Sequence, residues 1–273
     1  MTITKDGWRR LQAAGTSFLA AGDRDSTAPA LVCLHGIGGD ATSFRAQIDG
    51  VAGPRQQVLS WDMPGYGESV PLARMDFASL CARLCAALDE LGLSHVVIAG
   101  QSIGGMIAQE MAIRHPERVA GLVLIATVPA FGGRDDSFKD RFIAARLKPL
   151  DAGKTIAELA ESFVTDITGP VAGPEAIASA KASMAAVPEE TYRDIIRCLT
   201  TFNRRNDIED FNLPVCLIAG EHDQNAPAKT MASMAAKIKG SEYHEVKGAG
   251  HLINLEAGEE TNAILRAFYG RLG

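Results

Sequence analysis

Short apolar runs alternate with longer amphipathic stretches along most of the chain. Six short runs are typical of strands, at residues 30–34, 57–61, 95–99, 122–126, 215–219 and 242–246. Between them, residues 76–91, 103–115, 228–239 and 259–269 repeat their apolar positions with the period of a helix. Strands separated by helices predict an α/β fold, with a mostly parallel central sheet and helices on both of its faces.

Two departures from this alternation refine the prediction. Residues 8–11 and 16–20 predict an antiparallel strand pair at the sheet edge, with Ala14-Gly15 in the turn. Between Ala126 and Val215 the pattern is helical, at residues 137–147, 155–167, 174–186 and 189–202. We therefore expect a core of residues 1–126 and 213–273 and an all-helical lid of residues 127–212. The lid is expected over the carboxyl edge of the sheet, where open α/β sheets bind ligands.

Composition narrows the class of protein. Of 273 residues, 47% are hydrophobic and 22% charged, as in ordinary globular proteins, and the net charge of −6 argues against a nucleic-acid partner. No apolar run approaches the roughly 18 residues that cross a membrane, and the first residues do not resemble a signal peptide. We expect a cytoplasmic protein with no membrane partner and with five reduced cysteines that bind no metal. The oligomeric state stays open, a homo-oligomer included.

The segment Gly100-Gln101-Ser102-Ile103-Gly104 carries the most specific chemistry. It follows an expected strand and precedes an expected helix, which is the context of the G-x-S-x-G nucleophile elbow. In that turn the serine hydroxyl is exposed, and the flanking glycines avoid collisions with the neighbouring strand or helix. Ser102 is therefore the candidate nucleophile.

A serine hydroxyl needs a neighbouring base, and the base needs an acid that orients it. His251 lies in a small-residue loop after the last expected strand, so it is the candidate base. Asp223 follows the expected strand at residues 215–219 and is the candidate acid. Glu221 stays open as an alternative acid, and His222 is a rival base.

The developing oxyanion needs two backbone N–H donors. Ile103 supplies one, because it follows the nucleophile at the start of a helix. The glycine loop His35-Gly36-Ile37-Gly38-Gly39 supplies the other, and Ile37 is the candidate because glycine flanks it on one side and follows it on the other. We expect His35 to brace this loop rather than to act in catalysis.

Taken together, these segments resemble the α/β-hydrolase superfamily over nearly the whole chain. The resembling segments are residues 35–39, 62–69, 100–105, 220–223 and 248–251. Residues 102–109 (SIGGMIAQ) and 251–256 (HLINLE) are similar to 3-oxoadipate enol-lactonases and neighbouring carboxylesterases. The resemblance implies a nucleophile–acid–base triad of Ser102, Asp223 and His251, an oxyanion hole from Ile37 and Ile103, and no metal or other cofactor.

The expected activity is cleavage of an ester or lactone of a small carboxylic acid through an acyl-enzyme. Carbon–carbon hydrolysis of a ring-cleavage product stays open, although Ile37-Gly38-Gly39 departs from the serine–glycine–proline loop of many such enzymes. Cofactor-free perhydrolase chemistry of the haloperoxidase type and a non-catalytic receptor on the same fold are further alternatives.

The partner is expected to be a small-molecule substrate. Candidate substrate-binding residues are Gly36, Phe131, Arg134, Phe138, Phe142 and Leu252. An arginine of the expected lid would suit a substrate carboxylate, and the candidates are Arg134, Arg141, Arg146, Arg204 and Arg205. For any single one of these we favour the simpler interpretation, a solvated charge on a helix face.

Overall fold

The computed structural model describes residues 2–3, 7–132 and 137–272. Over these residues, nine strands form one sheet in the order β1-β2-β3-β5-β4-β6-β7-β8-β9. All pairings among the last six are parallel: β5 (Val58–Trp61), β4 (Leu31–Leu34), β6 (Val96–Gln101), β7 (Val119–Ile125), β8 (Val215–Gly220) and β9 (Glu242–Val246). The expected α/β fold and its six strands are confirmed.

The opposite edge of the sheet is antiparallel, as predicted. It consists of β1 (Thr2–Ile3), β2 (Arg9–Ala13) and β3 (Thr16–Ala21), and β3 also pairs antiparallel with β5. The β2–β3 turn has positive φ at both central residues, 47° at Ala14 and 73° at Gly15. A two-residue hairpin turn of this kind matches the twist of its strands. The two-residue strand β1 was not predicted, because so short a segment carries no periodic pattern.

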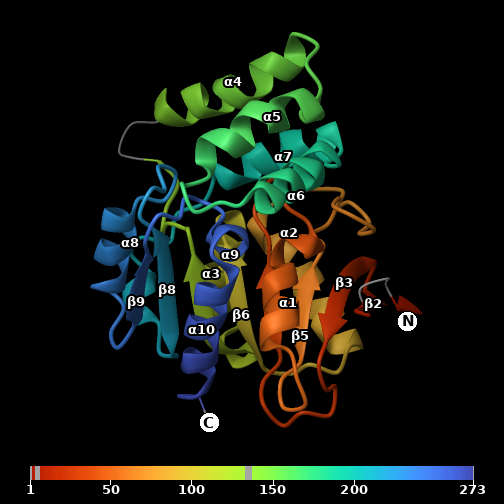
Figure 1. The fold of residues 1–273 in the computed structure, drawn as a ribbon, viewed down its shortest axis with the longest axis vertical. Helices are drawn as coiled ribbons and strands as arrows, with labels where there is room; N and C mark the ends of the chain where they lie inside the picture. The colour runs from red at the N-terminus through yellow and green to blue at the C-terminus, as the bar shows by residue number, and fades with distance from the viewer. Residues whose placement is uncertain (1, 4–6, 133–136, 273) are drawn as a thin grey trace.

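Each face of the parallel strands packs against its own layer of helices (Figure 1). On one face are α2 (Phe77–Glu90), α3 (Ile103–Arg114) and α8 (Ala228–Ala235), and on the other α1 (Arg45–Val51) and α10 (Gly258–Tyr269). Alternate residues of β6 enter the two cores, Val96 and Ile98 on the first face, Val97 and Ala99 on the second. A strand buried on both faces is apolar throughout, which is why these strands were readable as continuous apolar runs.

Four helices lie between β7 and β8, and we call them the helical insert. They are α4 (Ser137–Asp151), α5 (Ile156–Ile167), α6 (Pro174–Ala185) and α7 (Glu189–Leu199). Figure 1 shows them gathered at one end of the sheet, above the helical layers. Each was predicted, whereas α1 and the short α9 (Ile253–Glu256) were not, because seven and four residues are too few for a helical period to stand out. No helix within the described ranges is both long and apolar enough to span a membrane.

A buried carboxylate ties the end of the insert to the core. Glu110 of α3 accepts hydrogen bonds from Arg204 Nε and NH2 at 2.7 and 2.9 Å, and from Arg114 Nε at 2.5 Å. Burial alone would raise the pKa of Glu110, but the hydrogen bonds from the two arginines outweigh it and lower that pKa. The carboxylate is therefore ionised at neutral pH and stabilises the folded state there.

Replacing Glu110 with Gln is expected to lower the free energy of unfolding at pH 7 by about 1–3 kcal/mol, since two charge-assisted contacts become neutral ones. The folded pKa lies below the ordinary value of 4.5, so this contribution is complete above about pH 4.5 and is lost as the pH falls further. Urea unfolding at pH 7 and at pH 3.5 checks both points. The exposed pair Glu161–Lys181 supplies the control, because Glu161→Gln should change stability by under about 0.5 kcal/mol. A difference between wild type and Glu110→Gln that grew on acidification would contradict this account.

Candidate active site

Ser102 lies at the sharp turn between β6 and α3, as the motif predicts. Its backbone has φ 55° and ψ −119°, a conformation that non-glycine residues rarely adopt. The turn is crowded on both sides: a Cβ at Gly100 would collide with the backbone of Gly104, and one at Gly104 would collide with the carbonyl oxygen of Leu34. The glycines of the motif therefore let strand, turn and neighbouring strand approach closely.

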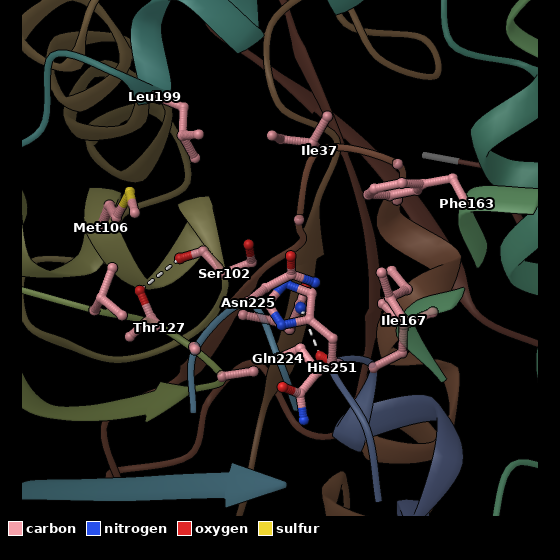
Figure 2. A pocket seen from close by; sticks show the side chains of 18 of the residues that line it. Ile37, Ser102, Met106, Thr127, Phe163, Ile167, Leu199, Gln224, Asn225 and His251 are labelled. Carbon is pink, nitrogen blue, oxygen red and sulfur yellow. Dashed lines mark hydrogen bonds between the residues drawn. The ribbon is translucent and has the colours of Figure 1, made fainter. Parts of the chain in front are cut away.

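Hydrogen bonds to the backbone of Ser102 hold this strained turn in place. Its N–H donates to Ile125 O at 2.9 Å, and its carbonyl accepts from Thr127 Oγ1 at 2.7 Å, the contact drawn as a dashed line in Figure 2. Both partners lie at the end of β7. The neighbouring strand thus fixes the serine backbone and leaves its side chain to the cavity.

His251 and Asp223 come together from the ends of β9 and β8. His251 Nδ1 lies 2.8 Å from Asp223 Oδ2, and both residues are buried. Asp223 Oδ1 accepts the N–H groups of Asn225 and Ala226 at 2.8 and 3.0 Å. Burial raises the pKa of Asp223, but His251 and these hydrogen bonds more than offset it and lower that pKa. The acid is therefore a carboxylate at neutral pH, able to orient the imidazole.

The rival residues lie elsewhere. The Glu221 carboxylate accepts the N–H of Gly248 at 2.9 Å and contacts Lys247, and His222 has a side chain that is 51% exposed. Neither lines the cavity into which Ser102 opens. Among the described residues no hydrogen bond joins Ser102 Oγ to His251, but both side chains line that one cavity and lie near each other in Figure 2.

Two backbone N–H groups next to Ser102 are without acceptors in the described part of the chain. They belong to Ile37, in the loop after β4, and Ile103, the first residue of α3. The loop itself is braced: His35 Nδ1 donates to Gly36 O at 2.7 Å, and Tyr66 OH donates to Ile37 O at 2.9 Å. Burial lowers the pKa of His35 to about 4, so its Nε2 is an acceptor, here for Met63 N–H at 3.1 Å. The expected bracing by His35 agrees with these contacts.

Glu256 of α9 is a residue whose part in the site sequence reasoning missed. Its carboxylate accepts three backbone N–H groups, from Gly250 and Gly169 at 2.7 Å and from Leu252 at 2.8 Å. Gly250 and Leu252 flank His251, and Gly169 belongs to the insert. Its place at the end of the HLINLE segment was visible in the sequence, but the partner in the insert was not.

A cavity of about 620 Å³ lies between the carboxyl ends of the strands and the insert. Figure 2 shows Leu199, Ile37 and Phe163 across it from Ser102 and His251. Of the predicted substrate-binding residues, Gly36, Phe131, Phe138, Phe142 and Leu252 line it. Arg134 lies outside the described residues. Phe202 does not line the cavity but packs on Phe77, with ring centroids 5.1 Å apart.

A potential metal-binding group lies apart from this cavity. Within the described ranges, Cys216, Glu242 and His244 on β8 and β9 bring their donor atoms within 4.8 Å of one another. Burial raises the pKa of the Cys216 thiol, and Arg271 forms an ion pair with Glu242. The thiol is thus protonated and the carboxylate engaged, so these residues do not fit a metal ion as they stand.

Comparisons with known proteins agree with this architecture. A curated relative, the dihydrolipoyllysine-residue acetyltransferase component of the acetoin cleaving system from Pseudomonas putida, is 28% identical over 252 residues, or 87% of this chain. The chain spans only 62% of that relative's length. Two solved structures share the fold: the enol-lactonase from Burkholderia xenovorans LB400 (TM-score 0.81, 21% identity, 95% of this chain and 99% of that one) and a thermophilic esterase from Thermogutta terrifontis (0.84, 22%, 97% and 99%). The family model described as alpha/beta hydrolase fold matches residues 29–258, and the chain therefore belongs to the α/β-hydrolase family.

Proposed function

We propose that this protein is a serine hydrolase that cleaves an ester or lactone of a small carboxylic acid through an acyl-enzyme. The observation that carries the proposal is the meeting of three groups at one cavity. Ser102 stands on the strained turn, the His251–Asp223 pair lies beside it, and the free N–H groups of Ile37 and Ile103 lie at the same place. The enol-lactonase and esterase among the structural neighbours are consistent with this class of reaction.

In this proposal Ser102 Oγ attacks the carbonyl carbon while His251 Nε2 takes its proton. Asp223 holds Nδ1–H and stabilises the imidazolium that forms. The oxyanion accepts hydrogen bonds from the N–H groups of Ile37 and Ile103, at the positive end of α3. His251 then gives its proton to the leaving alcohol, and a water deprotonated by His251 attacks the acyl-serine and releases the acid. No step in this sequence calls for a metal or other cofactor.

The helical insert serves as the lid in this proposal, covering residues 127–212 above the core. Its side chains supply much of the apolar wall of the cavity, including Phe142, Phe163 and Met184. An apolar wall excludes water from the acyl-enzyme and favours acyl groups with a hydrocarbon chain. A volume of about 620 Å³ is in the usual range for a small-molecule site.

A panel of p-nitrophenyl esters from acetate to octanoate, together with simple lactones, tests the activity. A fluorophosphonate probe with peptide mapping tests the nucleophile in the same samples. We expect turnover of at least one ester and a single adduct on Ser102. A protein that hydrolysed none of these substrates and took up no probe would support the non-catalytic receptor instead.

A further inference from the structure

We propose that Arg146 binds a carboxylate of the substrate, so that the preferred substrate is an ester or lactone of a dicarboxylic acid. This inference rests on the hydrolase activity proposed above and adds the chemical class of its acyl group. The favoured interpretation from sequence, that each arginine of the insert is a solvated charge, does not fit the surroundings of this one.

The charges that line the cavity are of one sign. Among the described residues that line it, the arginines are Arg141 and Arg146, both on α4, and there is no aspartate or glutamate. The chain as a whole carries a net charge of −6, so the cavity is opposite in charge to the protein around it. An anionic substrate is therefore attracted to this cavity in preference to the rest of the surface.

Arg146 is held in an apolar part of the wall. Its guanidinium carbon lies 3.7 Å from the centre of the Phe142 ring and 5.7 Å from that of Phe163, and the side chain is half-buried. In the described part of the chain, none of its five N–H donors meets a protein acceptor. Burial lowers the pKa of Arg146, as expected for a cation with no carboxylate nearby.

Other arginines of the insert and the segment after it have acidic partners. Arg193 contacts Asp151 and Glu189, Arg197 contacts Asp194, and Arg204 contacts Glu110 and Asp207. Arg205 is exposed and donates to Gly132 O. Arg141 is exposed and donates to Ser137 Oγ at 2.6 Å.

The physical balance favours a carboxylate ligand. Ring faces stabilise a guanidinium from above, but they leave its in-plane donors unused. A carboxylate in that plane accepts two parallel N–H bonds in a site from which water is partly removed, which is the strong form of this contact. Ser102 and Arg146 line the same cavity, so one substrate can place its reacting carbonyl at Ser102 and its remote carboxylate at Arg146.

Two esters of equal chain length test this inference: p-nitrophenyl hexanoate, which is neutral, and mono-p-nitrophenyl adipate, which ends in a carboxylate. We expect the wild type to prefer the adipate ester. Arg146→Met should lower kcat/KM for that ester about 30- to 150-fold, mainly through KM, and change the hexanoate rate by under about 3-fold. Retained hexanoate activity shows that the variant is folded, and Arg146→Lys, which keeps the charge but not the fork, should fall between the two.

Free adipate supplies a second readout, as a competitive inhibitor of hexanoate hydrolysis. Its inhibition constant should rise in Arg146→Met by a factor similar to that for the adipate ester, whereas Arg141→Met is the matched control with a smaller effect. Hexanoate turnover with no preference for the adipate ester, or equal losses on both esters in Arg146→Met, would overturn the carboxylate site and leave the hydrolase standing. If the wild type hydrolysed neither ester, the hydrolase proposal and this inference would fail together.

Discussion

Ser102→Ala is expected to lower kcat/KM for every accepted ester by a factor of about 10⁴ to 10⁶, because the acyl-enzyme can no longer form. The same variant should take up no fluorophosphonate. Initial rates with the best ester of the panel measure the loss, and active-site titration of the wild type fixes the concentration of competent enzyme. Ser162→Ala, on the exposed side of α5, is the control and should retain the wild-type rate. Near wild-type turnover in Ser102→Ala would rule out this serine as the nucleophile.

Ser102 also bears on stability, because its positive φ is strained for any residue with a side chain. Ser102→Gly should therefore unfold at a higher free energy than Ser102→Ala by about 1 kcal/mol, although both lack activity. Thermal or urea unfolding of the two variants side by side measures this difference. Equal stabilities would mean that the turn is not strained in solution.

Asp223→Asn is expected to lower kcat by about 10⁴-fold while the protein stays folded. The amide that replaces the carboxylate presents a donor to His251 Nδ1, which favours the tautomer that cannot accept the serine proton at Nε2. Steady-state kinetics across pH 5 to 9 measures the loss, which should persist at every pH because a carboxamide does not titrate.

The matched control is Glu221→Gln, which tests the other acid of the same loop. Its carboxylate contacts Gly248 N–H and Lys247 rather than His251, so the rate should stay within about 2-fold of wild type. A large loss in Glu221→Gln with little loss in Asp223→Asn would reverse the assignment of the acid.

Local pattern was sufficient to predict most of the fold. The strands of the parallel sheet are buried on both faces, so apolar runs such as residues 96–99 stand out against amphipathic helices. The insert was equally readable, since α5 begins at Thr155 with a reciprocal capping box to Glu158 and α6 begins with Pro174 at its first position. What escaped prediction was short: β1, α1 and α9 contain too few residues for a period.

The candidate site was predictable only where a local motif marks a place in the fold. Ser102, Asp223 and His251 each follow a strand, and the carboxyl ends of parallel strands meet at one edge of a sheet. The roles of Glu256 and Arg146 depend instead on neighbours far along the chain. Glu256 contacts Gly169, 87 positions away, and Arg146 differs from Arg204 only in having no Glu110 beside it.

Glu256 has a consequence for where this chain can be lengthened. Its carboxylate joins Gly169 to the two residues that flank His251, and His251 N–H itself donates to Ile167 O at 2.7 Å. The segment after α5 is therefore spliced to the histidine loop, and a Cβ at Gly169 would collide with the backbone of Gly248. By contrast, residues 152–154, between α4 and α5, are exposed at every position. A peptide tag or graft belongs at residues 152–154, while one at residues 168–170 would displace the imidazole from thirty ångströms of chain away or from none.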